Sequence, residues 1–234
     1  MKEIRLNRVR MLLGIAALLF SAALGIGGGA LRVDAADDGA IAPDKTPLLN
    51  GQIATFANYT SYSRGINGIM VDVAGWSNVT SVSAANFTFR TGNDGAPKTW
   101  PLATPPTSVS VRLGAGDNQA DRISLIWPDN TFRRSWLQVA LLGSPSTPLE
   151  NANIFYFGNA VGETGNSAAN ANVTSVDSVA VLGNLQASGA TITNRYDFNR
   201  SKTVSSADAS IALGNLAVGT AALQLINLTA FGSP

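Results

Sequence analysis

Short runs of β-branched and aromatic residues, separated by turn-forming residues, recur from residue 52 to residue 158 and constrain the fold more than any other feature. The runs are QIATFA, GIMVDV, NFTFRT, SVSVRL, RISLIW, WLQVALL and NIFYFG. In SVSVRL, apolar residues alternate with serine and arginine, as in a strand with one buried and one exposed face. Residues 52–158 therefore predict an antiparallel β-sandwich, Ig-like or jelly-roll-like, of seven or more strands.

The N-terminus has a basic start followed by an apolar run from Met11 to Ile26, which is typical of an export signal. Residues 1–35 are interpreted as a signal peptide that is cleaved after Ala35, so the mature protein is expected to be secreted, extracellular or at the cell surface, without membrane contact. A retained anchor helix is the alternative, because the run is close to the shortest length that spans a bilayer. Residues 36–51 are rich in Asp, Pro, Gly and Ala and are expected to be a flexible linker.

The 234-residue chain has neither histidine nor cysteine, which removes the usual general base, most zinc sites, thiol chemistry and disulfides. Sixteen basic and 15 acidic residues give a formal net charge of +1, which argues against a nucleic-acid partner. We therefore expect a non-enzymatic protein held together by core burial, with calcium as the ion that suits an oxygen-only ligand set.

Four tryptophans divide into two groups. Trp127 and Trp136 fall in strand-like runs and are expected in the core, whereas Trp76 and Trp100 fall in loops, where an exposed ring can stack on a sugar. Even for the loop pair, structural packing is the favoured interpretation, and a carbohydrate platform is the alternative. Four acids are expected on a solvated loop or strand face, and an acid pair for glycoside hydrolysis is the alternative if two of them face each other: Asp72, Asp117, Asp121 and Asp129.

The C-terminal part contains an internal repeat with an offset of 31 residues. VTSVDSVAVLGNLQA, from Val173, aligns with VSSADASIALGNLAV, from Val204. Each copy has a Ser/Thr-rich N-cap, an acid in the first turn and a short apolar helix expected to end near Gly189 or Gly219. Two leucines three residues apart in each copy predict that the helices pack against each other: Leu182 and Leu185, Leu213 and Leu216.

The second copy has the spacing of a calcium-binding loop. The potential ligands fall at positions 1, 3, 5, 7 and 12: Asp197, Asn199, Ser201, Thr203 and Asp208. Val204, at position 8, and the matching Val173 are expected to be apolar plugs that pair the two loops. Lys202 replaces the glycine usual at position 6, and its side chain at positive φ costs about 1 kcal/mol. Ser201 replaces an acid, which weakens binding. Extracellular sites have a Kd of roughly 10⁻⁴–10⁻³ M, and this loop is expected at the weak end of that range or empty.

The first copy offers a weaker ligand set. With Asp177 at position 12, no charged oxygen precedes it unless an enlarged loop includes Glu163. An ion here is therefore assigned to Glu163, Asn166, the Asn172 carbonyl and Asp177. The alternative for both copies is a polar turn that caps a helix and holds no metal.

The repeat resembles the type I dockerin module, a pair of degenerate EF-hand-type calcium loops with the pattern D-x-N-x-D-G-x-V-x-x-x-D, and DFNRSKTVSSAD carries the match. ATFANYTSYSRGINGIMVDV, LIWPDNTFRRSWLQV and FYFGNAVGETGNS resemble the end regions of large secreted bacterial proteins, where a β-sandwich precedes such a module. The resemblance implies a dockerin-like calcium-binding domain over residues 159–234, after a sandwich over 52–158, with a cohesin-like protein domain as partner.

Three functions follow from these observations. The favoured one is a secreted, non-catalytic calcium-binding protein whose dockerin-like module mediates protein–protein attachment in extracellular or polysaccharide-degrading assemblies. The alternatives are a carbohydrate-binding β-sandwich, with polysaccharide as the ligand, and a small glycoside hydrolase. The first is favoured because the repeat in calcium register is the most specific signal in the chain.

Overall fold

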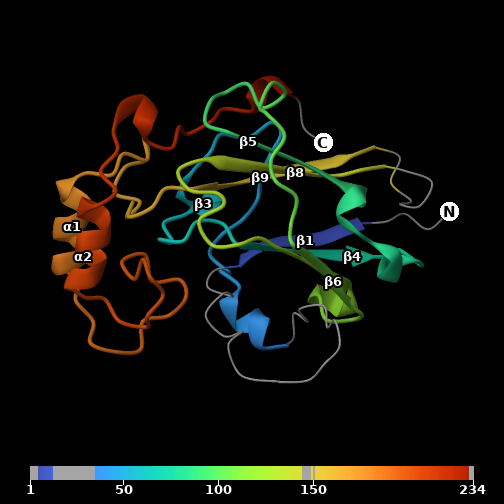
Figure 1. The fold of residues 1–234 in the computed structure, drawn as a ribbon, viewed down its shortest axis with the longest axis horizontal. Helices are drawn as coiled ribbons and strands as arrows, with labels where there is room; N and C mark the ends of the chain where they lie inside the picture. Colours follow the sequence, from blue (N-terminus) through green and yellow to red (C-terminus); the bar gives the residue numbers. More distant parts are fainter. Residues whose placement is uncertain (1–4, 13–34, 144–148, 150, 232–234) are drawn as a thin grey trace.

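The computed structural model describes residues 5–12, 35–143, 149 and 151–231, and it is mostly antiparallel β-sheet with two short α-helices (Figure 1). The first sheet has the order β1-β4-β7-β6, formed by Arg5–Leu12, Gly68–Ala74, Asp121–Ile126 and Ser108–Arg112. The second has the order β2-β9-β8-β5, formed by Leu48–Leu49, Asn153–Asn159, Trp136–Leu141 and Phe87–Gly92. Strand β3 (Tyr59–Thr60) pairs in parallel with β9. The predicted β-rich fold with a small helical part is confirmed.

Six of the seven strand-like runs form strands β4 to β9. QIATFA is the exception, because it leads into a 3₁₀ helix, η3 (Phe56–Asn58). The backbone N–H of Thr55 donates to the side-chain oxygen of Asn58 at 2.8 Å. This local hydrogen bond takes the place of a bond to a neighbouring strand. Ile53 in this run forms an isolated bridge with Asn227 near the C-terminus.

One buried cluster contains residues of both sheets. It takes alternate residues from strands of both sheets, as the two-residue period of a strand requires. The contributors include Ile69, Val71 and Val73 from β4, Ile123 and Leu125 from β7, Leu137, Val139 and Leu141 from β8, and Phe155 and Phe157 from β9. Trp127 is buried in the same cluster, as predicted.

A second cluster covers the other face of the second sheet. Trp136 and Tyr156 contribute to it from β8 and β9, and side chains from residues 223–228 pack on them. The indole N–H of Trp136 donates to the carbonyl oxygen of Gln224 at 2.8 Å. Every residue of β8 is buried, which explains why its sequence reads as a nearly continuous apolar run. The C-terminal segment is thus part of the same packed structure as the sheets.

Residues 36–51, expected to be a flexible linker, are packed instead. They contain most of a 3₁₀ helix, η2 (Ala35–Ala40), and all of β2, which pairs with β9. Ile41, Ala42 and Leu48 are buried. These few apolar side chains anchor the segment despite its polar composition.

Strand β1 lies inside the segment expected to be the export signal. It pairs antiparallel with β4, from Arg5 opposite Ala74 to Leu12 opposite Gly68, and forms one edge of the first sheet. Residues 13–34, with most of the apolar run, lie outside the described residues. Within the described part of the chain, no helix has the length and hydropathy needed to cross a membrane.

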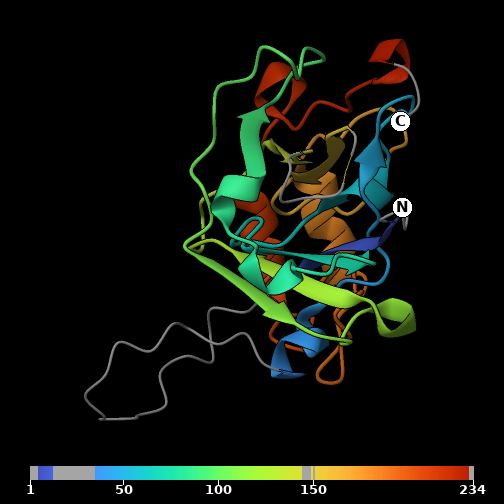
Figure 2. The ribbon, with the colours of Figure 1, turned by 90° about the vertical axis from the view of Figure 1, so that its right-hand side faces the viewer.

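The two helices, α1 (Ser175–Leu182) and α2 (Ser206–Leu213), lie together at one end of the molecule (Figure 1). Figure 2 views the molecule from the other end, so the helices lie behind the sheets. One side of the helix pair therefore faces the rest of the protein, and the other side faces solvent.

Candidate functional site

The two copies of the repeat fold as similar units that exchange backbone hydrogen bonds. Val173 exchanges two N–H···O bonds with Ala217, at 2.8 and 2.9 Å, and Val204 exchanges two with Gln186, at the same two distances. Both valines are buried, as expected of apolar plugs. However, each loop pairs with the segment that follows the other copy's helix, whereas the sequence led us to expect the two loops to pair with each other.

The helices contact each other through small side chains. Val181 of α1 is buried in one cluster with Ala209 and Ala212 of α2, and Phe198 from the second loop completes it. The leucines predicted to make this contact are instead half or more exposed: Leu182, Leu185, Leu213 and Leu216. The helices do pack against each other, as predicted, but the contact is made by these smaller side chains and not by the leucines.

Both helices also end before the expected Gly189 and Gly219. After α1, the side-chain amide of Asn184 donates to the carbonyl oxygen of Ala180 at 2.8 Å, and Asn215 repeats this bond after α2. The bond satisfies a carbonyl of the last turn that has no helical N–H partner. The second leucine of each predicted pair therefore lies beyond its helix.

The Asp208 carboxylate is buried in the second loop and accepts hydrogen bonds from the chain itself. One oxygen accepts from the backbone N–H groups of Phe198, at 2.9 Å, and Asn199, at 3.4 Å. The other accepts from the N–H of Ser205 at 3.0 Å and from its hydroxyl at 3.3 Å. Asp208 and Ser205 thus form the capping box of α2.

The other candidate ligands of the second loop also come together in one turn. Asp197 accepts from the backbone N–H groups of Ser201 at 3.0 Å and Lys202 at 2.9 Å. The side-chain oxygen of Asn199 accepts from the same Ser201 N–H, and the hydroxyls of Ser201 and Thr203 lie 2.7 Å apart. Lys202 has φ 65°, which confirms the positive φ expected at position 6.

A cation from the chain, Arg200, occupies this turn. Its guanidinium donates to the carbonyl oxygens of Asn194, at 2.6 Å, and Asp197. Burial lowers the pKa of Arg200, and the Asp197 carboxylate acts against that effect. Burial also raises the pKa of Asp197, against the hydrogen bonds it accepts. The loop therefore contains its own positive charge beside its acids.

In the first loop, Asp177 is the equivalent of Asp208, and its carboxylate also accepts hydrogen bonds from the chain itself. One carboxylate oxygen accepts from the N–H and hydroxyl of Thr164, at 3.0 and 2.8 Å, and from the amide of Asn166 at 2.9 Å. The other accepts from the N–H of Thr174 at 2.8 Å in the capping box of α1. The position-12 acid of each copy is thus a hydrogen-bond acceptor that fixes the start of a helix.

The remaining predicted ligands of the first loop are divided. Glu163 is buried next to Asp177 and accepts from the Tyr59 hydroxyl and the Gly165 N–H, both at 2.7 Å. Burial raises the pKa of Glu163, although the Tyr59 hydrogen bond acts in the opposite direction. Asn172 lies apart, where its side-chain oxygen accepts from the N–H of Gly219 at 3.2 Å.

These loops do not fit a calcium cage as folded. Calcium takes six to eight oxygen ligands, whereas the carboxylates of Asp177, Asp197 and Asp208 accept from N–H and O–H donors on every oxygen. Across the described ranges, no group of three or more acidic, histidine or cysteine side chains is placed to hold a metal.

The resemblance to a dockerin module is therefore wrong. Comparison with known proteins supports the correction, because no family model, no curated protein and no solved structure matches the chain. The sequence pattern was misleading because two different structures share it. A helix capping box has an acid three residues after a Ser or Thr, and a calcium loop has the same spacing between its ligands at positions 9 and 12.

The tryptophans do not form a sugar-binding platform. All four are buried, which agrees with the expectation for Trp127 and Trp136 and overturns the exposed alternative for Trp76 and Trp100. Trp100 packs edge-to-face on Tyr156 with ring centroids 6.0 Å apart, and its indole N–H donates to Asp94 at 2.8 Å.

The acids considered for glycoside hydrolysis are engaged in structural contacts, and the backbone N–H of Asp117 donates to the Asp72 carboxylate at 3.0 Å. Asp72 is buried and receives two bonds from the Arg122 guanidinium, at 2.7 and 2.8 Å. Asp129 forms an ion pair with Arg64 at 2.8 Å. Asp121 accepts from the backbone N–H of Gly114 at 2.9 Å.

The paired helices carry the main exposed apolar surface. Val176, Val179 and Leu182 follow one another at a spacing of three residues along α1, with exposed fractions of 60%, 66% and 50%. We call these three residues the α1 stripe. The equivalent residues of α2 are Ala207, Ser210 and Leu213. Leu185, Leu216 and Val218, which follow the two helices, are also more than half exposed.

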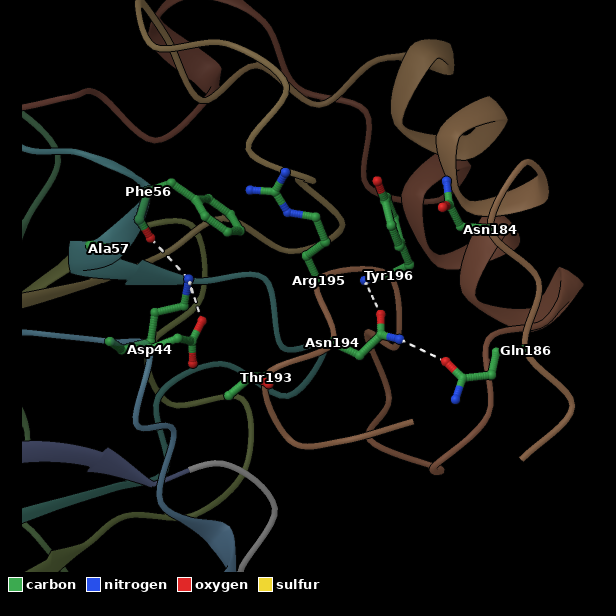
Figure 3. A pocket seen from close by; sticks show the side chains of 10 residues that line it. Asp44, Phe56, Ala57, Asn184, Gln186, Thr193, Asn194, Arg195 and Tyr196 are labelled. Carbon is green, nitrogen blue, oxygen red and sulfur yellow. Dashed lines mark hydrogen bonds and ion pairs between the residues drawn. The ribbon is translucent and has the colours of Figure 1, made fainter. Parts of the chain in front are cut away.

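Sequence reasoning also missed a pocket of about 520 Å³ between the segment around η3 and the turn that precedes the second loop. Phe56, Asn184, Arg195 and Tyr196 are among the residues that line it (Figure 3). Its parts are more than 100 residues apart in the chain, so no local pattern could have indicated it.

Proposed function

We propose that this protein is secreted or displayed at the cell surface and acts without catalysis as an attachment protein. Its sheets, arranged as an Ig-like or jelly-roll-like sandwich, serve as the scaffold, and its paired C-terminal helices dock onto a partner protein. The observation that carries this proposal is the α1 stripe, three large apolar side chains in a row toward solvent.

Exposed apolar area of this kind is unfavourable in water. A soluble monomer rarely exposes contiguous apolar patches larger than a few hundred Å², and burying a valine or leucine contributes about 1.5–3 kcal/mol. Of the ten large apolar side chains that are exposed among the described residues, seven lie between residues 176 and 218. The concentration in one short region favours a binding surface over scattered exposure.

The charge of the region indicates the chemistry of the partner. Residues 173–194 and 203–231 each contain one charged side chain, Asp177 and Asp208, and both are buried. The docking surface therefore has no charge to pair with a charged partner. It suits a different protein with an uncharged apolar groove that accepts the exposed side of one helix.

The repeat itself supplies the test variant. Val176→Ala with Val179→Ser gives α1 the residues that α2 has at the equivalent positions, so the helix should still form. A photo-crosslinking residue at Ser175 identifies the secreted partner, and calorimetry with the purified partner measures affinity. We expect the double variant to bind at least tenfold more weakly, because about 0.8 kcal/mol is lost for each buried CH₂ removed.

Leu102→Ser and Leu113→Ser are matched controls, because both leucines are exposed outside the repeats. They should leave the affinity unchanged. An unchanged affinity in the double variant, or an equal loss in the controls, would remove the α1 stripe from the interface. A concentration-dependent dimer that the double variant abolishes would instead assign the stripe to self-association.

A further inference from the structure

The pocket beside η3 has an aromatic and cationic wall formed by Phe56 and Arg195. The guanidinium carbon of Arg195 lies 4.7 Å from the centroid of the Phe56 ring. Gly165, with φ 70°, closes against this pair, because a Cβ there would lie 2.6 Å from an Arg195 nitrogen and 2.7 Å from a Phe56 ring carbon. Phe56 and Gly165, from two distant segments, thus enclose the Arg195 guanidinium, and Figure 3 shows it beside the Phe56 ring.

Arg195 is also the uncompensated charge of the pocket. The other charged lining residues, Asp44 and Lys45, form an ion pair at 3.2 Å, and Lys45 donates a further bond to the Phe56 carbonyl oxygen at 2.9 Å. Arg195 has no ion pair with any of the residues that the structure describes. The pocket therefore has a net charge of +1 at its Arg195 side.

Aromatic and polar side chains line the pocket beside Arg195. The backbone N–H of Tyr196 donates to the side chain of Asn194 at 2.9 Å, and the Asn194 amide donates to Gln186 at 3.1 Å, which fixes the position of Tyr196 (Figure 3). The Asn184 amide donates to a helix carbonyl, so its oxygen is turned away from that bond. Among the described contacts, the Tyr196 hydroxyl and the Asn184 oxygen are left for a ligand.

We propose that this pocket binds a carboxylate-bearing sugar, such as a uronate unit of an acidic polysaccharide. The guanidinium of Arg195 pairs with the carboxylate in a bidentate manner, the Tyr196 ring packs on the apolar face of the sugar, and Asn184 with the Tyr196 hydroxyl bonds to sugar hydroxyls. The volume lies within the 300–1,000 Å³ typical of small-molecule sites. This binding is separate from docking through the α1 stripe.

The experiment titrates the full chain with D-galacturonate and D-glucuronate, with the neutral methyl ester of galacturonate, and with acetate, and follows backbone amide shifts by NMR. We expect saturable binding of the uronates with shifts at residues 184–196, and at least tenfold weaker binding of the ester and of acetate. Arg195→Gln should abolish the difference between acid and ester. Tyr196→Ala should weaken both, and Tyr196→Phe should retain most of the affinity.

Lys98→Gln is the control, because Lys98 is another cation next to a phenyl ring, 5.4 Å from the centroid of Phe231, and does not line the pocket. It should leave uronate binding unchanged, as should Val176→Ala with Val179→Ser, which separates this site from the docking surface. Equal affinity for acid and ester, acetate binding as tight as uronate, shifts confined to other residues, or no uronate binding would each overturn the proposal.

Discussion

Replacing Asp208 by asparagine tests whether the buried acids of the repeats are hydrogen-bond acceptors or metal ligands. The carboxylate accepts from three backbone N–H groups and one hydroxyl, and an asparagine side chain has one oxygen with which to accept. With that oxygen turned toward Ser205, its NH₂ group would face the N–H of Phe198. One buried N–H then loses its acceptor, which costs about 1–3 kcal/mol.

The lost negative charge adds to this cost, because hydrogen bonds to charged groups contribute about 1.5–3 kcal/mol. We therefore expect Asp208→Asn to lower the free energy of unfolding by roughly 2–4 kcal/mol. For a chain of this size that is a decrease in Tm of roughly 4–16 °C.

The assay is thermal unfolding by circular dichroism, in EDTA and in about 5 mM calcium, a concentration above the Kd of weak extracellular sites. We expect the same Tm for the unmodified protein in both buffers and the same loss for the variant. Asp121→Asn is the control, since that acid is only partly buried and accepts one backbone N–H. A loss seen only in calcium would identify Asp208 as an ion ligand and refute the hydrogen-bond account.

Two further substitutions address the same loops. Lys202→Gly should stabilise the protein by roughly 0.5–1 kcal/mol in urea unfolding, because Lys202 has φ 65° and glycine removes that strain, whereas Lys98→Gly, at an ordinary φ, should destabilise it. Glu163→Gln should change how stability depends on pH. Burial raises the pKa of Glu163 in the folded protein, so the folded state binds this proton more tightly than the unfolded state does. The stabilisation of the folded state by this tighter proton binding is fully present below the ordinary glutamate pKa of about 4.3. It is lost as the pH rises through the higher pKa of the folded protein. The glutamine variant should therefore gain stability relative to the unmodified protein as the pH rises above about 4.3 in urea unfolding, and a constant difference would contradict this.

The strands were predictable because their signal is local. In GIMVDV and RISLIW, alternate apolar residues belong to the buried cluster that both sheets share, and the pattern is complete within one strand. The helix starts were also predictable, because Thr174 with Asp177 and Ser205 with Asp208 form capping boxes within four residues of chain.

What the sequence did not indicate depends on distant segments. Trp100 is buried against Tyr156, and Gly92 leaves it room, since a Cβ there would lie 2.3 Å from the indole. The pocket requires Phe56, Gly165 and Arg195 to meet. The dockerin resemblance failed for another reason: polar turns that cap helices and metal loops use the same residue types at the same spacing.

Strand β1 would give removal of the proposed leader a structural consequence. If the leader is removed after Ala35, the first sheet loses this strand, and the N–H and C=O groups of β4 that bonded to it become a free edge. A free edge of this length readily recruits another strand. The precursor and the mature form would then differ in their tendency to aggregate or to accept an extended peptide, although they share every residue after the cleavage point.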